Sequence, residues 1–195
     1  MRIDADRTFR KALERGPSAA TSLIPRDYLD AVGAIKDFVL YYRPLLDREE
    51  SRLAGRVNSD ALLRDLAERS FQAMRDTWRQ LVVDASKAGW ALRTNPVEHR
   101  AAKRFTEATV TPLLLGCPLI GRTWNKPLGY AGDYVVMEYY YRDAFEGASV
   151  FDQVMHRLFV QNPMAKGVVT RARFIVDTIN REHERISPDG KQGFA

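Results

Sequence analysis

The stretch Ser59–Trp90, SDALLRDLAERSFQAMRDTWRQLVVDASKAGW, decides the fold class of this chain. Its apolar side chains return at steps of four and three residues, at Ala67, Phe71, Met74, Trp78 and Leu81. In an α-helix, side chains at this spacing form one stripe along one face. The stripe therefore predicts a long amphipathic helix whose apolar face packs against other elements of the chain.

Proline and asparagine indicate where further helices begin and break. Pro25 suits a first helical turn, whereas Pro44, inside the same apolar-periodic segment, predicts a kink or a split because it removes a backbone donor. Asn95 and Asn162 each precede a proline, and this pair predicts a helix cap followed by the first helical residue. The last of these helices carries an apolar face, formed by Val168, Ala172, Ile175 and Ile179.

No segment gives a convincing strand pattern. We therefore predict an all-α helical bundle with one long irregular loop around residues 116–132. We divide the chain into an N-terminal helical arm (1–22), a helical bundle domain (23–186) and a linker (187–195). A chain of 195 residues is long enough for one domain to bury an ordinary hydrophobic core, and short for two.

Composition and charge narrow the class of protein. The formal net charge of +5 is spread along helical faces without a dense basic block, which argues against nucleic acid as a partner. No apolar run approaches the roughly 20 residues that cross a bilayer, and residues 1–16 are too charged for a signal peptide. The single cysteine, Cys117, excludes an internal disulfide. We therefore predict a cytoplasmic protein with no membrane span.

Few side chains offer catalytic or metal-binding chemistry. His99, His156 and His183 lie far apart, and none has a second histidine or a cysteine at a metal-ligand spacing. We expect each of them to be a polar residue on a helix face. Cys117 has no neighbouring basic group that would activate it as a nucleophile. We therefore predict no metal site and assign no catalytic residue.

The stretch 116–132, GCPLIGRTWNKPLGYAG, has two interpretations. It holds four of the twelve glycines and two of the nine prolines of the chain. In the first interpretation it is a structural corner: Gly129 and Gly132 allow turns closed to other residues, and Asp133 caps the following helix, which runs to about Ala144. Tyr130 then fills a gap between helices.

In the second interpretation the same stretch lines a binding pocket. Long irregular segments inside compact domains tend to be functional. Basic side chains and a phenol would suit an anionic small molecule. The candidate substrate-binding residues are Arg122, Lys126, Tyr130, Asp133 and Tyr134.

Part of the chain resembles a known family. The segments Glu98–Tyr141 and Glu146–Ile179 are similar to the helical region that precedes the catalytic domain in certain bacterial class I S-adenosylmethionine (SAM)-dependent methyltransferases. These are the enzymes of the extracellular-factor 3-hydroxypalmitic acid methyl ester biosynthesis type. The specific part of the resemblance is the run KPLGYAGDY, Lys126–Tyr134. The helices before Pro96 share only general character with the family.

The resemblance implies a function and a set of partners. It implies methyl transfer from SAM to the carboxylate of a hydroxy fatty acid or a similar acidic or lipid-like small molecule. The helical region would cap the active site or join two subunits as a homodimer. The linker at 187–195 would lead toward a C-terminal SAM-binding domain, the Rossmann-like sheet that holds the cofactor.

The linker at 187–195 would end just before that domain. We therefore expect no methyltransferase activity and no cofactor binding from the 195-residue chain alone. The alternative, from the residues themselves, is a non-enzymatic all-α module that binds a protein partner or senses a ligand.

Overall fold

The computed structural model describes Thr21 and residues 23–186. Apart from Thr21, the predicted arm at 1–22 and the predicted linker at 187–195 lie outside these residues. Within the described part the chain forms eight α-helices, one short 3₁₀ helix and no strand, so the all-α prediction is confirmed. The elements are α2 (Arg26–Leu53), α3 (Ser59–Ala91), η1 (Leu92–Thr94), α4 (Pro96–Thr109), α5 (Thr111–Leu114), α6 (Pro118–Asn125), α7 (Tyr134–Arg142), α8 (Val150–Val160) and α9 (Pro163–Ile186).

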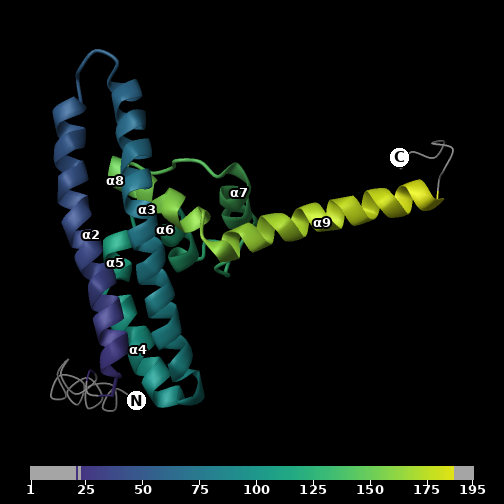
Figure 1. Ribbon diagram of the computed structural model, residues 1–195, viewed down its shortest axis with the longest axis horizontal. Helices are drawn as coiled ribbons and strands as arrows, with labels where there is room; N and C mark the ends of the chain where they lie inside the picture. Colours follow the sequence, from purple (N-terminus) through teal and green to yellow (C-terminus); the bar gives the residue numbers. More distant parts are fainter. Residues whose placement is uncertain (1–20, 22, 187–195) are drawn as a thin grey trace, which may run out of the picture.

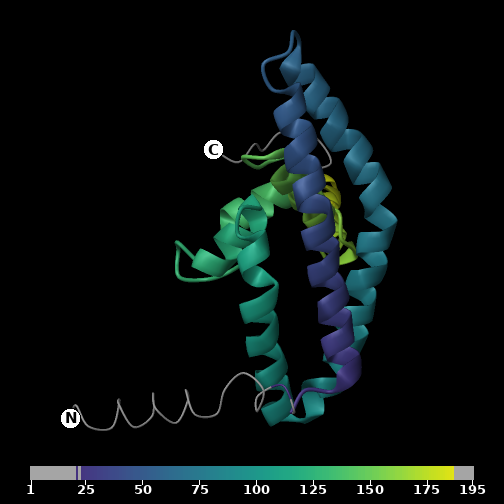
Figure 2. The same cartoon turned by 90° about the vertical axis from the view of Figure 1, so that its left-hand side faces the viewer.

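The two longest helices set the shape of the molecule. α2 and α3 run antiparallel as a hairpin, and α4 returns beside the end of the hairpin that holds the start of α2 (Figures 1 and 2). α8 contacts both helices of the hairpin, and α6 and α7 follow beyond it. α9 begins against α7 and α8 and then extends away from the bundle (Figure 1).

The hydrophobic core lies where α8 packs against the hairpin. Eight of the eleven residues of α8 are buried. Trp78 of α3 lies between Phe38 of α2 and Phe159 of α8, with ring centroids 5.4 and 5.2 Å away. The stripe predicted for α3 is the face turned to this core, since its buried members are Ala67, Phe71, Met74 and Trp78. Leu81, the last member of the stripe, packs against the same cluster while partly buried.

The prediction of a split at Pro44 is wrong. α2 is one continuous helix across that residue. Proline removes the hydrogen bond that the carbonyl of Leu40 would accept, but Leu40 and Pro44 are both exposed, so water reaches that carbonyl. Packing of the opposite face of α2 on α3 and α8 then outweighs the lost bond.

The irregular loop is shorter than predicted. Of the stretch 116–132, residues Pro118–Asn125 form helix α6, with a proline at the first helical position. The irregular residues are 116–117, before α6, and those after it; we call residues 126–133 the α6–α7 loop. Pro118 marks the start of this short helix, whereas Gly121 lies inside it. The number of glycines and prolines alone therefore does not distinguish a short helix from a continuous loop.

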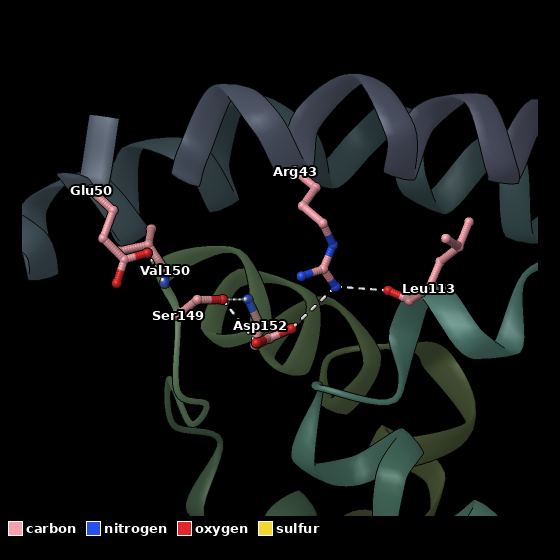
Figure 3. A network of polar contacts seen from close by, with 6 residues as sticks. All are labelled: Arg43, Glu50, Leu113, Ser149, Val150 and Asp152. Carbon is pink, nitrogen blue, oxygen red and sulfur yellow. Dashed lines mark hydrogen bonds and ion pairs between the residues drawn. The ribbon is translucent and has the colours of Figure 1, made fainter. Parts of the chain in front are cut away.

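A polar network fixes α2 and α5 to the start of α8 (Figure 3). Arg43 of α2 donates to the backbone carbonyl of Leu113 at 2.7 Å and contacts the Asp152 carboxylate at 3.4 Å. The other oxygen of Asp152 accepts from the hydroxyl of Ser149 at 2.8 Å, while the Ser149 side chain caps α8 through the backbone N–H of Asp152. Asp152 is buried, so the network supplies its polar partners inside the bundle.

Two further contacts hold the same end of α8. Glu50 of α2 accepts from the backbone N–H of Val150 at 2.9 Å (Figure 3). The backbone at Gly116 passes so close to Asp152 that an added Cβ would lie 2.6 Å from its carboxylate oxygen. This approach explains a glycine at position 116 without any binding role.

Replacing Asp152 with asparagine should test the network. Removing one partner of a largely buried ion pair leaves the other charge without compensation, so we expect Asp152→Asn to lower the free energy of unfolding by about 2 kcal/mol. Urea denaturation followed by circular dichroism measures it. The exposed Asp177→Asn of α9 is the control and should change stability by less than about 0.5 kcal/mol. Equal effects of the two substitutions would show that the network does not hold α8.

Candidate functional site

The α6–α7 loop and the residues just before it form an exposed projection. Every residue from 124 to 132 is exposed to solvent. The projection is bounded by buried groups, Leu119 at the base of α6 and Val136 in the first turn of α7. The sequence therefore places a solvent-facing loop between two anchored helices.

A buried ion pair supports the loop from below. Asp133 is fully buried, and both of its carboxylate oxygens lie 2.8 Å from Nε of Arg122 in α6. One of these oxygens also accepts from the backbone N–H groups of Val135 and Val136, at 3.1 and 3.2 Å. The same carboxylate thus caps α7 and ties it to α6, as the predicted cap at Asp133 required.

The pair neutralises its own charge. The hydrogen bond from Arg122 holds the pKa of the Asp133 carboxyl below its usual value, against the opposing effect of desolvation. The same hydrogen bond raises the pKa of the Arg122 guanidinium. Both groups are therefore charged near neutral pH and satisfy each other. Of the five candidate binding residues, these two support the loop, and Asp133 has no exposed surface for a ligand.

Lys126 has an unusual backbone conformation. It ends α6 in the left-handed region, with φ 48° and ψ 56°. The other described non-glycine residues with positive φ are Asn58 and Asp143, residue types that adopt this region more easily. Lysine in this position costs roughly 1 kcal/mol relative to glycine. Its exposed side chain pairs with no acidic group among the described residues, so it is an uncompensated positive charge on the loop.

The exposed aromatic residues lie on both sides of this charge. Tyr130 and Tyr134 are 54% and 64% exposed, so Tyr130 does not fill a gap between helices as the corner interpretation expected. Trp124 and Leu128 are also largely exposed, at 45% and 50%, and our sequence reading did not include them. In the sequence, these two residues are large apolar residues between turn-forming residues. A buried loop would show the same pattern.

The two glycines of the loop differ in their conformation. Gly129 has φ +86°, which a residue with a Cβ adopts only under strain, and its N–H donates to the carbonyl of Lys126 at 2.8 Å. Gly132 lies outside the left-handed region and has open space around it. The loop-shaping role therefore has a backbone reason at Gly129 and none at Gly132.

Substituting Lys126 should separate its backbone role from its side chain. We expect Lys126→Gly to raise the free energy of unfolding by about 0.5–1 kcal/mol, because glycine adopts the left-handed conformation without strain. Lys126→Ala keeps the strain and should leave stability close to that of the wild type. Urea denaturation of the three proteins gives the comparison. A glycine variant less stable than the alanine variant would show that position 126 is unstrained.

His156 differs from the prediction of a polar helix-face residue. It is fully buried in α8, edge-on to the ring of Tyr139 at a centroid distance of 4.9 Å. Neither of its ring nitrogens has a hydrogen-bond partner. Burial, together with repulsion from Arg142, lowers its pKa to about 4. The imidazole is therefore neutral at physiological pH and packs as a core residue.

Stability should fall as the pH drops below the ordinary histidine range. The unfolded chain takes up a proton at His156 near pH 6.5, whereas the folded chain does so only near pH 4. The stabilisation that the neutral His156 contributes is complete above pH 6.5 and is lost as the pH falls toward 4. This loss lowers the free energy of unfolding by on the order of 2–3 kcal/mol. Denaturation at pH 7, 6 and 5 measures it. His156→Met, which cannot titrate, should lose that part of the pH dependence; an unchanged profile would contradict the assignment.

Cys117 is unsuited to nucleophilic chemistry. Its side chain is buried, and desolvation raises the pKa of the thiol to about 12. The thiol is therefore protonated at neutral pH, which agrees with leaving it out of the predicted site.

A concave region lies at the other end of the bundle. This cleft of about 290 Å³ is lined by Tyr28, Gly89, Leu92, His99, Ala102, Lys103, Thr106 and Glu107. Its cation, Lys103, lies 3.8 Å from the Glu107 carboxylate, so the cleft carries little net charge toward an anion. The hydroxyls of Tyr28 and Thr106 bond to each other at 2.8 Å. Lys103 and Tyr28 are thus paired within the cleft, in contrast to Lys126.

Comparison of the chain with protein-family models, with curated proteins and with solved structures finds no match. Across the described helices, none has the length and apolarity needed to cross a membrane. In the same residues, no three histidine, cysteine, aspartate or glutamate side chains gather where they could hold a metal ion. The α6–α7 loop therefore remains the best-defined candidate site on its own geometry.

Proposed function

We propose that this chain is the helical, substrate-capping part of a SAM-dependent methyltransferase, and that the α6–α7 loop contacts the acceptor. The observation that supports it is an uncompensated lysine in a strained backbone conformation, flanked by exposed tyrosines and supported by the Arg122–Asp133 pair. Strain of this kind is retained where a side chain has a role. The resemblance of Lys126–Tyr134 to the methyltransferase family supplies the reaction class.

The chemistry of the loop suits an amphipathic acid. The Lys126 ammonium would pair with a carboxylate, while the rings of Tyr130 and Tyr134 would cover the adjoining apolar chain. Methyl transfer to a carboxylate needs no general base, because the acceptor is ionised at neutral pH. The contribution of these residues would be to hold the acid in position and to exclude water, which lowers the barrier through proximity and orientation.

The described helices do not fit the cofactor. A class I methyltransferase holds SAM in a crevice at the ends of sheet strands, and residues 21 and 23–186 form no sheet. We therefore assign SAM to a separate C-terminal catalytic domain.

A second candidate is a non-enzymatic interaction or sensing module. The exposed apolar side chains of α9 favour it, since a large apolar surface outside the loop indicates contact with another protein. The two candidates differ in whether the loop binds an acid.

Binding of a short hydroxy fatty acid should identify the acceptor site. We expect 3-hydroxydecanoate, followed by amide chemical shifts in NMR spectra, to shift residues of the α6–α7 loop and the start of α7. Lys126→Met should weaken this binding by about fivefold or more, because it removes the ion pair. Lys103→Met, in the cleft beside α4, is the matched control and should bind as the wild type does.

Other outcomes would overturn the assignment. Loss of binding in Lys103→Met with normal binding in Lys126→Met would move the site to the cleft. No shifts in either region up to millimolar acid would favour the interaction module. Calorimetric titration of SAM into the same 195-residue chain should give no binding; saturable binding there would contradict the assignment of the cofactor to another domain.

A further inference from the structure

The apolar face of α9 continues beyond its contacts with the bundle. At about 100° per residue, Ala165, Val168 and Ala172 lie on the same face as Ile175 and Ile179. The first three are buried or partly buried in the part of α9 that begins against α7 and α8. Ile175 and Ile179 are 49% and 61% exposed. One continuous stripe thus changes from packed to open along the helix.

The open half of α9 is accessible. It extends away from the hairpin and from α4 (Figure 1), so a second helix would meet it without displacing the bundle. Along with Ile175 and Ile179, Val176 and Ile186 lie on the stripe and are 54% and 70% exposed. Phe174 is 63% exposed but points about 140° away from the centre of the stripe. A surface of this kind on one helix is typical of helix–helix association.

The charges beside the stripe specify a partner. Residues 163–176 contain three basic residues and no acidic one, whereas 177–186 contain three acidic and two basic residues. Arg171 and Glu182 both lie along one edge of the stripe, about 60–80° from its centre. When two copies of a helix pair antiparallel, like edges face each other and the two ends exchange places. Arg171 of each copy then meets Glu182 of the other copy.

We propose that the α9 stripe is a homodimer interface in which two copies of the chain pair antiparallel through residues 171–186. The antiparallel order also opposes the two helix dipoles, whereas a parallel pair would align them. The basic half of each helix faces the acidic half of the other, and Ile175, Val176 and Ile179 form the shared apolar centre. Because this contact involves neither the α6–α7 loop nor a ligand, it stands apart from the proposed function.

Sedimentation of the whole chain tests the proposal without ligand. We expect a reversible, concentration-dependent dimer, and we expect Ile179→Glu to weaken it by at least about tenfold because it places a charge in the apolar centre. The matched control is Phe174→Glu, which adds the same charge to the opposite side of the same helix and should dimerise as the wild type does. Circular dichroism confirms that both variants remain folded.

Exchanging the charges tests whether the charged edge of the stripe lies in the dimer interface. Arg171→Glu alone should weaken the dimer, and adding Glu182→Arg should restore it, since the exchanged charges again meet across the symmetric interface. A wild-type chain that stays monomeric at high micromolar concentration overturns the proposal and leaves the stripe for a different protein, such as a catalytic domain. Dimers insensitive to Ile179→Glu would place the interface elsewhere.

Spin labels decide the direction of the pair. The native Cys117 thiol is buried, so a single introduced cysteine is labelled selectively. In the antiparallel dimer, labels at Lys166→Cys should lie roughly 30 Å or more apart and labels at Thr178→Cys much closer, given 1.5 Å of rise per residue. Short distances at both positions would indicate a parallel pair and would contradict the proposal.

Discussion

Burial of α8 against the α2–α3 hairpin is the constraint on which the other helices depend. α8 lies between the two long helices and contacts α6 and α9 on its other side, so the elements that form the candidate site reach the hairpin through it. Its polar residues are fixed as firmly as its apolar ones, because Asp152 lies within the network of Arg43 and Ser149. The register of α8 therefore decides where α7 and the root of α9 lie.

In the α6–α7 loop, the residues that support the backbone are different from the residues that are exposed to solvent. Arg122 and Asp133 satisfy each other below the surface and cap α7, whereas Lys126 and the tyrosines are presented to solvent above them. A ligand at such a site would meet groups on a backbone that is already fixed, which reduces the entropy lost on binding. The structural-corner interpretation holds for Arg122 and Asp133, and the binding interpretation depends on the exposed residues above them.

The protein has two exposed surfaces of different chemistry, one just before α7 in the sequence and one after it, on α9. The loop before α7 combines one free cation with aromatic rings, which suits a small amphipathic acid. The open half of α9 is an apolar stripe with Arg171 and Glu182 along one edge, which suits a helix. The packed half of the same stripe contacts α7 and α8, so both surfaces are anchored to the same helices.

The sequence by itself determined the helical class, because periodicity and helix caps are local properties. The stripe of α3 and the caps at Asn95 and Asp133 needed no distant contact. Tertiary structure decided what distant residues do to one another: it kept α2 continuous through Pro44, buried His156 and paired Arg122 with Asp133. It also decided that half of the α9 stripe is open, since an apolar periodicity shows that a face needs covering and only the packing of other helices shows whether it is covered.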